Sequence, residues 1–282
     1  MSTVELRNVK FSVLMSVYNK ECPEYLEKSL RSVFDQTLLP SEIVLVEDGP
    51  LTADLNSVIN RVKFEHNGLL KIVKIEKNVG LGMALNEGLK HCKYNLVARM
   101  DADDFANKNR FEKQISVLIN REDVDVVGSN VCEYDKELEN KLNEKNVPEH
   151  DSDIKKYLLK RNPLNHMTVI YKKDKVIEAG SYLDCPFFED YYLWCRMAKN
   201  GCKFFNIQDS LVKVRAGQAM VNRRGGLLYA KNSINFEKKI LRLKTINIFG
   251  FILNSSIRVA VALSPNSLRK AIYSRGLRNG EK

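Results

Sequence analysis

The sequence predicts an α/β fold in which a mostly parallel central sheet carries helices on both faces. Short apolar runs rich in β-branched residues recur along the first half of the chain. Segments with apolar residues at helical spacing separate these runs. This alternation is typical of parallel strands that are buried on both faces. Polar clusters follow the ends of four of the runs, at the edge of the sheet where such folds bind ligands.

A local pattern supports each element in the first 130 residues. The expected strands are FSVLMSV (11–17), EIVLVE (42–47), LLKIVKI (69–75), NLVARM (95–100) and DVDVVGS (123–129). The expected helices are 23–37, with Pro23 suited to the first turn, a segment near 52–65, the segment that follows EKNVG, and 110–120. The clusters YNK, EDGP, KNVG and DADD follow the first four strands in order. We therefore expect a ligand site at this edge of the sheet.

The alternation fades beyond residue 130. Residues 133–161 are charged and are expected to be mostly helical or loop-like. A further strand is expected at 167–173, and a helix that begins with acidic residues at 187–201. The apolar stretch 246–263 predicts a helix in the C-terminal tail.

The composition excludes several classes of protein. A chain of 282 residues with 44% hydrophobic and 28% charged residues is expected to be globular. Its six cysteines form no CxxC pair and its four histidines lack the spacing of metal ligands, which argues against a disulfide frame and against a zinc centre. The chain opens without an apolar leader and has no stretch of about 18 apolar residues. We therefore expect its catalytic part to be cytoplasmic.

The positive charge is concentrated in the tail. Residues 203–282 hold 16 Lys or Arg and only three carboxylates, so the net charge of +10 arises entirely from this part of the chain. This distribution argues against a nucleic-acid-binding core. It favours a tail helix that lies on an anionic membrane surface, although a plain core helix stays an alternative.

Three carboxylates lie within four positions at the end of the fourth expected strand. Asp101, Asp103 and Asp104 would repel one another unless a positive charge lies between them. Residues i and i+2 that leave a strand point the same way, so Asp101 and Asp103 can converge on one divalent cation. The alternative is a solvated acidic turn. The role of Asp104 stays open between a third ligand and a helix cap.

Other charged residues are weaker candidates. Glu189 and Asp190 lie among aromatic residues, where partial desolvation can raise their basicity, but they also suit a helix N-terminus. His166 precedes an expected strand and could be purely structural. Arg215, Arg223 and Arg224 suit phosphate oxygens, as would any solvated basic loop. The sequence contains neither a P-loop, nor a G-x-G-x-x-G fingerprint, nor a G-x-S-x-G nucleophile elbow.

The ordered set of motifs resembles the family 2 glycosyltransferases, which have the nucleotide-diphosphosugar transferase (GT-A) fold. The matching elements are SVLMSVYNK, EIVLVEDGP, KNVGLGMALNEGL, VARMDADD, NPLNHMTVIY, FFEDYYLW and RRGG, which span about residues 11–226. The resemblance is strongest to bacterial enzymes that build O-antigen and exopolysaccharide repeat units on a lipid carrier.

The resemblance implies roles for individual residues. The residues that it places at the nucleotide sugar are Val17, Tyr18, Asn19, Asp48 at the uracil ring, Asn78, Gly80, Arg99, Asp101, Ala102, Asp103, Arg223 and Arg224. Asp101 and Asp103 match the motif that holds a divalent metal, Mn²⁺ or Mg²⁺. Asp190 matches the catalytic base, with Glu189 as the alternative. His166 and Trp194 fall on the acceptor side.

The implied reaction is inverting, metal-dependent transfer of a hexose from a UDP-sugar to a lipid-linked acceptor. The narrower expectation is that the hexose of UDP-galactose or UDP-glucose is added in a β-linkage, with β-1,3 as the candidate, to N-acetylglucosamine diphosphate undecaprenol. The processive signature Q-x-x-R-W is absent from the sequence, which indicates transfer of one sugar per encounter. Alternatives are a sugar-nucleotide nucleotidyltransferase and a non-catalytic nucleotide-sugar-binding subunit on a membrane.

The same motifs predict the domain organisation. Residues 1–226 are expected to form the glycosyltransferase domain, with a nucleotide-sugar half at about 1–130 and an acceptor half at about 131–226. Residues 227–282 are expected to form a basic helical extension that associates with the membrane. The protein is therefore expected on the inner face of the plasma membrane.

Overall fold

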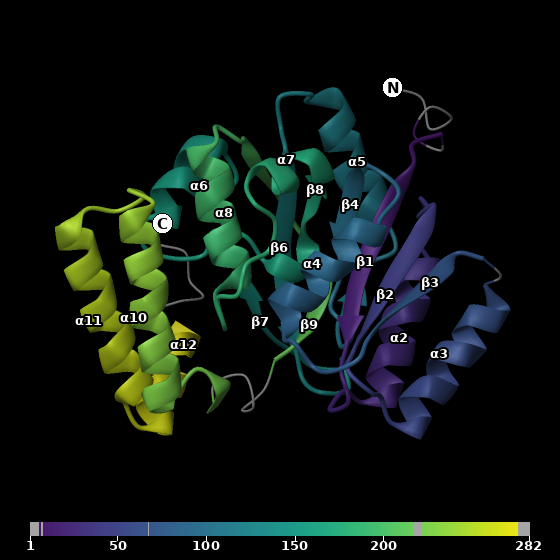
Figure 1. Cartoon of the computed structure of the whole chain (residues 1–282), viewed down its shortest axis with the longest axis horizontal. Helices are drawn as coiled ribbons and strands as arrows, with labels where there is room; N and C mark the ends of the chain where they lie inside the picture. The colour runs from purple at the N-terminus through teal and green to yellow at the C-terminus, as the bar shows by residue number, and fades with distance from the viewer. Residues whose placement is uncertain (1–5, 7, 67, 217–221, 276–282) are drawn as a thin grey trace.

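The computed structural model describes residues 6, 8–66, 68–216 and 222–275, with side chains to residue 272. One nine-stranded sheet runs through the molecule, and helices cover both of its faces (Figure 1). Eight of its strands follow the order β3-β2-β1-β4-β8-β6-β9-β5, and β7 pairs with β6. This arrangement confirms the predicted fold class.

The first four strands are those that the sequence predicts. They are β1 (Phe11–Val17), β2 (Glu42–Asp48), β3 (Leu70–Ile75) and β4 (Leu96–Arg99), and these four strands are parallel to one another. Residues along β1 alternate between two cores. Val13 and Met15 pack with helices α2 (Pro23–Phe34), α3 (Ala53–Glu65) and α5 (Arg110–Asn120), whereas Leu14 packs on the other face with α4 (Leu81–His91). Burial on both faces explains why the strands read as apolar runs.

The second part of the sheet contains strands that the sequence did not predict. β6 (Val126–Tyr134) runs beyond the expected strand, β7 (Lys141–Lys145) lies in a segment expected to be helical or loop-like, and β9 (Phe204–Arg215) was not expected at all. β6 pairs with β9 in parallel, whereas the remaining pairings, including β4 with β8 (Ile170–Lys172) and β9 with β5 (Phe105–Ala106), are antiparallel. The charged and polar residues of β7 and β9 hide their strand character because these strands are only partly buried.

Short helices connect these strands. Residues 166–168 form the 3-10 turn η1 (His166–Thr168) rather than the start of the expected strand, and β8 follows it. The other helices in this second part of the sheet region are α6 (Asp151–Leu158), α7 (Lys173–Glu178) and α8 (Glu189–Lys199).

The chain ends in a lobe of three helices, α10 (Gly226–Arg242), α11 (Ile248–Leu263) and α12 (Asn266–Arg275). This C-terminal lobe lies at the end of the molecule opposite to β3, with α11 outermost (Figure 1). Phe236 of α10 joins the lobe to the body by stacking on Phe188 and packing on Tyr191 of α8, with ring centroids 4.7 and 4.6 Å apart. No helix among the described residues has the length and apolarity to cross a bilayer.

Candidate active site

The carboxylates that follow β4 converge at the carboxyl edge of the sheet. One carboxylate oxygen from each of Asp101, Asp103 and Asp104 lies within 4.8 Å of the others. Burial is the main cause of a rise in the pKa of Asp103 to about 7, and the neighbouring Asp101 and Glu21 carboxylates add to it. Burial and the same cluster raise the pKa of Asp104 well above its usual range. These oxygens fit a hard divalent cation, which prefers carboxylate ligands and would offset their repulsion.

Two arginines hold the carboxylate loop in place. Arg99, which is only 1% exposed, forms an ion pair with Asp101 through Nη2. Its Nε and Nη1 atoms have no hydrogen-bond partner among the described residues, although Arg99 lines the cavity described below. Arg215, at the end of β9, donates its backbone N–H to Asp104 Oδ1 at 3.0 Å and its guanidinium to the carbonyl of Asp103. Asp104 therefore fastens the loop to β9, while Asn109 occupies the cap position of α5.

A second pair of carboxylates lies at the N-terminus of α8. Asp190 Oδ2 accepts a hydrogen bond of 2.6 Å from Asn162 Nδ2, and Oδ1 accepts one of 2.7 Å from the backbone N–H of Tyr191. Burial raises the pKa of Asp190, and these two hydrogen bonds oppose the rise. Burial followed by the Asp190 charge raises the pKa of Glu189 to about 7. Glu189 can therefore change protonation near neutral pH, and the raised pKa of Asp190 makes its carboxylate a stronger base than a solvated aspartate.

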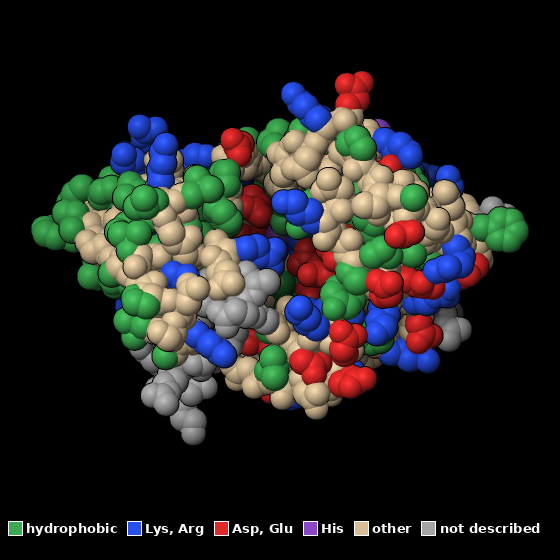
Figure 2. Space-filling view, turned by 90° about the horizontal axis from the view of Figure 1, so that it is seen from below, with side chains coloured by type: hydrophobic (Ala, Val, Ile, Leu, Met, Phe, Trp, Pro, Cys, Tyr) green, Lys and Arg blue, Asp and Glu red, His purple; other side chains and the backbone are tan. Residues whose placement is uncertain are grey.

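The two carboxylate groups meet in one cavity of about 360 Å³. Asp101 and Arg99 line it from β4, and Glu189 and Asp190 line it from α8. Figure 2 shows a hollow in this face of the molecule with acidic side chains inside it and basic side chains at its rim. The remaining basic side chains of the lining are Lys145, Arg161, Arg224 and Arg258. The cavity thus joins a candidate cation site to a candidate base.

The acceptor-side residues differ in their access to this cavity. His166 lines it and lies 3.0 Å from the hydroxyl of Tyr182 through Nε2. Burial and the nearby Arg99 hold the pKa of His166 well below its usual range, so its ring is neutral at physiological pH. Trp194 is fully buried and packs edge-on against His166 at a centroid distance of 6.1 Å. Trp194 therefore packs against His166 and is not among the residues that line the cavity, and its place on the acceptor side stays a prediction.

Asp48 organises the loop after β3. Its Oδ1 accepts a hydrogen bond of 2.7 Å from Val79 N, and its Oδ2 accepts bonds of 3.0 and 3.1 Å from Asn78 Nδ2 and Gly80 N. A carboxylate has about four acceptor positions, so one remains for the N–H of a uracil ring. The role of Asp48 at uracil stays a prediction.

Two glycines allow this loop to approach its neighbours. Gly49 has a φ of +86°, and a Cβ at this position would lie 2.7 Å from Asn78 N. At the first turn of α4, a Cβ on Gly82 would lie 2.9 Å from the Cβ of Glu189. The absence of a side chain at Gly82 lets α4 and α8 pack closely, which brings the loop of Asn78 and Gly80 toward the candidate base.

The remaining predicted residues lie around this edge. Val17 is buried at the end of β1, while Tyr18 and Asn19 after it are exposed, and Ala102 is buried within the carboxylate loop. Arg224 lines the cavity. Arg223 is exposed, and its charge acts on Glu21, which in turn neighbours Asp101. The loop that precedes Arg223 includes residues 217–221, which lie outside the described residues.

Several site residues were not predicted from the sequence. Asn162 holds Asp190, and Lys145 and Arg161 line the cavity. Arg215 was a candidate for binding phosphate, but its contact with the carboxylate loop was not predicted. Asn162 and Arg215 lie in or beside motifs that were noticed, RNPLNH and VRAG, but their partners are distant in sequence. Only the tertiary structure shows what they contact.

Comparison with known proteins decides the family. The profile described as glycosyl transferase family 2 matches residues 12–180, which is more than half of the chain. The chain belongs to this family. It is a glycosyltransferase, and the predicted family and enzyme class are confirmed. Neither a nucleotidyltransferase nor a non-catalytic subunit finds support in these matches.

Curated relatives match along nearly the whole chain. The amylovoran biosynthesis glycosyltransferase AmsE of Erwinia amylovora is 43% identical over 265 residues, which is 94% of this chain and 98% of AmsE. A UDP-Gal:alpha-D-GlcNAc-diphosphoundecaprenol beta-1,3-galactosyltransferase of Escherichia coli is 39% identical over 269 residues, which is 95% of this chain and 97% of that enzyme. The similar proteins thus include bacterial glycosyltransferases of exopolysaccharide synthesis and of lipid-linked acceptors.

Solved structures confirm the GT-A fold. A mannosyltransferase of Pyrobaculum calidifontis, solved with GDP-Man and Mn²⁺, superposes with a TM-score of 0.63 at 16% identity, over 96% of this chain and 77% of that one. Residues 1–349 of S. aureus TarS, solved with UDP-GlcNAc, superpose with a TM-score of 0.60 at 21% identity, over 83% of this chain and 67% of that one. Proteins of this fold therefore bind nucleotide sugars, and one of them holds a divalent metal.

Proposed function

We propose that this glycosyltransferase moves one hexose from a UDP-sugar to a lipid-linked acceptor, with inversion at the anomeric carbon and with a divalent cation. The observation that carries the proposal is the shared cavity. Asp101 enters it from the carboxylate cluster at the sheet edge, and Asp190 enters it from the start of α8. One cavity therefore has a place for a charged leaving group and a place for a base.

The donor and acceptor follow from the relatives. The E. coli relative is named for UDP-galactose and N-acetylglucosamine diphosphate undecaprenol. At 39% identity over nearly the whole chain, it supports UDP-galactose as the first donor to test, a β-1,3 linkage as the first product and UDP-glucose as the second donor. The basic side chains in the cavity lining suit a substrate that carries phosphates.

The residues that would hold the cation are Asp101 and Asp103. A bound Mn²⁺ or Mg²⁺ supplies charge that stabilises the diphosphate as it departs. Arg99 positions Asp101 through their ion pair and presents further donors to the cavity. We place Arg223 and Arg224 over the diphosphate, where they exclude water and limit hydrolysis of the donor.

Asp190 is the proposed base. The acceptor hydroxyl oxygen attacks C1 of the sugar, its proton passes to the Asp190 carboxylate, and the bond from C1 to the diphosphate breaks with its electron pair leaving on UDP. Attack from the side opposite the leaving group inverts C1, so an α-linked donor gives a β-glycoside. Asn162 positions Asp190 by its hydrogen bond of 2.6 Å. The neutral His166 ring can hydrogen-bond an acceptor hydroxyl without adding charge.

The deciding experiment incubates the purified chain with a panel of UDP-sugars, Mn²⁺ or Mg²⁺, and a synthetic N-acetylglucosamine diphospholipid. We expect a product with UDP-galactose that disappears when EDTA is added, and mass spectrometry with NMR will give its mass and linkage. A product that forms equally well with EDTA would refute the metal dependence. Absence of product with every donor would refute the donor or acceptor class.

A further inference from the structure

Helix α11 buries Asn254 and exposes most of its large apolar side chains. Asn254 and Ala262 are its buried residues. The large apolar side chains that it exposes, at 52–78%, are Ile248, Phe249, Ile252, Leu253, Ile257 and Leu263. These residues recur at intervals that place them along one side of a helix, and we call them the α11 outer face. A helix surrounded by water is expected to show the reverse pattern.

The buried polar side chains fix this orientation. Asn254 Nδ2 donates to the carbonyl of Leu159 at 2.9 Å. Arg258 donates through Nε to Glu237 Oε1 at 2.7 Å and through Nη2 to the carbonyl of Lys160 at 3.0 Å. Turning the helix to bury its apolar residues would leave the buried Glu237 carboxylate without Arg258, a large cost. The outer face is therefore held outward by specific bonds.

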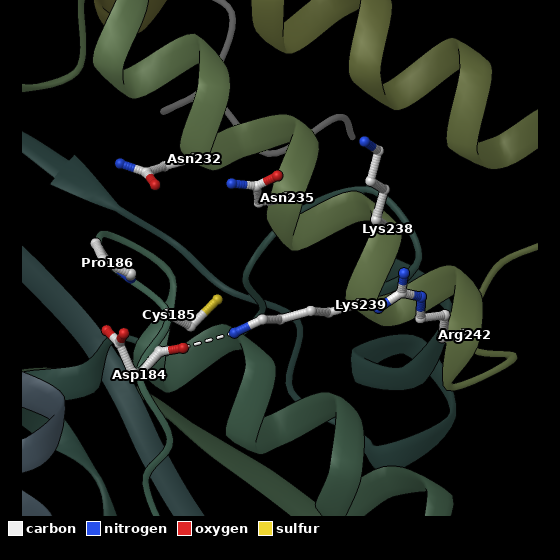
Figure 3. Close-up of a pocket in the computed structure, with 8 residues that line it drawn as sticks. All are labelled: Asp184, Cys185, Pro186, Asn232, Asn235, Lys238, Lys239 and Arg242. Carbon is white, nitrogen blue, oxygen red and sulfur yellow. Dashed lines mark hydrogen bonds between the residues drawn. The ribbon is translucent and has the colours of Figure 1, made fainter.

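The surroundings of the α11 outer face are basic. Between residues 222 and 272 the only carboxylate is Glu237, which is fully buried. The same segment contains Arg223, Arg224, Lys231, Lys238, Lys239, Arg242, Lys244, Arg258, Arg269 and Lys270. A groove of about 450 Å³ lies between α10 and the segment 184–186. Figure 3 shows Lys239 reaching across it to donate a hydrogen bond to the carbonyl of Asp184. Lys238 and Arg242 also line this groove, so the lobe presents a cluster of cations.

The lobe lies beside the active-site cavity. Figure 2 shows apolar side chains gathered over the lobe at the left, with basic side chains along its edge, on the same face as the hollow that contains the acidic residues. Tyr229 of α10 and Arg258 of α11 line the cavity itself. A surface that meets the lobe would therefore lie near the cavity opening.

We propose that the α11 outer face docks on an anionic lipid bilayer, with the helix lying along the membrane surface and the basic residues of α10 at the headgroups. This inference deepens the proposed function, because a membrane-anchored acceptor would then meet the cavity opening. The apolar side chains fit the acyl boundary, and the cations fit lipid phosphates. A second copy of the chain fits less well, because two such basic lobes repel each other.

The test is sedimentation of the purified full chain with two kinds of vesicle. One contains phosphatidylcholine alone, and the other contains phosphatidylglycerol as about one lipid in three. We expect binding to the anionic vesicles only. Phe249→Glu with Ile252→Glu should abolish binding, and Lys238→Glu with Arg242→Glu should weaken it by at least about fivefold for each cation removed. The matched control is Phe64→Glu, since Phe64 on α3 is 89% exposed but lies outside the lobe; this variant should bind as the unchanged protein does.

Other outcomes separate this inference from the proposed function. Circular dichroism checks that each variant is folded, and transfer to a water-soluble acceptor with a short lipid chain should be unaffected by Phe249→Glu with Ile252→Glu. Vesicle binding that survives this double substitution would overturn the docking surface. Absence of vesicle binding together with a dimer that the same substitution dissociates would overturn it in favour of a second copy. Loss of transfer to every acceptor with normal vesicle binding would count against the proposed function alone.

Discussion

Helix α2 buries its large apolar side chains, whereas α11 exposes most of its own. α2 packs Leu26, Leu30 and Val33 against the sheet and exposes Arg31 to water. α11 packs Asn254 against the body and exposes Phe249 and Ile252. Both helices are amphipathic, so their composition alone does not show which side faces inward. The outer side of α2 therefore suits water, whereas the outer side of α11 suits an apolar surface.

The catalytic edge of the sheet and the C-terminal lobe also differ in the charge and polarity of their side chains. At the catalytic edge, Glu189 and Asp190, whose pKa values are raised, share a cavity with the buried Arg99. In the lobe, the one carboxylate is neutralised by Arg258 and the exposed surface is apolar and basic. Substitutions at the edge should therefore change chemistry, and substitutions on the lobe should change where the protein binds.

The largest effect is expected at the cation site. Asp103→Ala should reduce turnover by roughly a thousandfold, because a metal that stabilises the leaving group contributes several kcal/mol. The measurement is the initial rate with UDP-galactose and a soluble acceptor, together with UDP affinity in the presence of Mn²⁺. Asp209→Ala is the control, since Asp209 pairs with Lys113 on the surface at 2.5 Å. Normal turnover in Asp103→Ala would remove this residue from the reaction.

The same substitution, Asp103→Ala, should increase thermal stability although it decreases turnover. The pKa of Asp103 in the folded, metal-free protein is about 7, above its value in the unfolded chain, so its ionisation destabilises the fold as the pH rises through this value. Asp103→Ala should therefore raise the melting temperature measured without metal at pH 8. A lower melting temperature would show that the loss of turnover has a structural cause.

The next largest loss of turnover is expected when the proposed base is replaced. Asp190→Asn should retain UDP binding and lose turnover by about a hundredfold, the lower end of the range for removal of a general base. Glu189→Gln should lose about tenfold or less, because this side chain is proposed only to neighbour the base. Single-turnover kinetics and UDP titrations measure the two effects. The reverse order would assign the base to Glu189.

A pair of stability measurements tests the comparison of the two helices directly. Leu30→Ala in α2 should lower the free energy of unfolding by about 3 kcal/mol, because it opens a cavity in the core. Ile252→Ala in α11 should change it by less than about 0.5 kcal/mol, because Ile252 is 56% exposed. Urea denaturation without lipid measures both. A large loss for Ile252→Ala would mean that the α11 outer face is covered in solution.

The smallest effect is a shift in the pH profile. The hydrogen bond from Asn162 lowers the pKa of Asp190, so Asn162→Ala should raise that pKa. The acidic limb of the turnover profile should then move to higher pH, with turnover above the limb reduced by less than about tenfold. Asn56→Ala is the control, since Asn56 caps a surface turn through the Leu51 and Thr52 carbonyls. An unchanged limb would show that Asn162 does not position the base.

Local sequence patterns were enough to predict the parallel strands β1 to β4. β1 to β4 are buried on both faces, so burial alone makes them apolar runs, and the helices between them carry a regular apolar side. The sequence also predicts Asp101, Asp103, Glu189 and Asp190 as candidate site residues, because closely spaced carboxylates in apolar surroundings are unusual without a function.

The second half of the sheet, and the residues that hydrogen-bond to the site carboxylates, depend on contacts between segments that are far apart in the chain. β9 is held by β6, whose paired residues Tyr134 and Arg215 lie about eighty positions away from each other in the chain, so no local pattern shows the pairing. The same holds for Asn162 at Asp190 and for Arg215 at Asp104. The orientation of α11 was likewise decided by distant contacts, the bonds of Asn254 and Arg258 to residues of other helices. Periodicity shows that a helix has two sides, but the residues packed against it decide which side is buried.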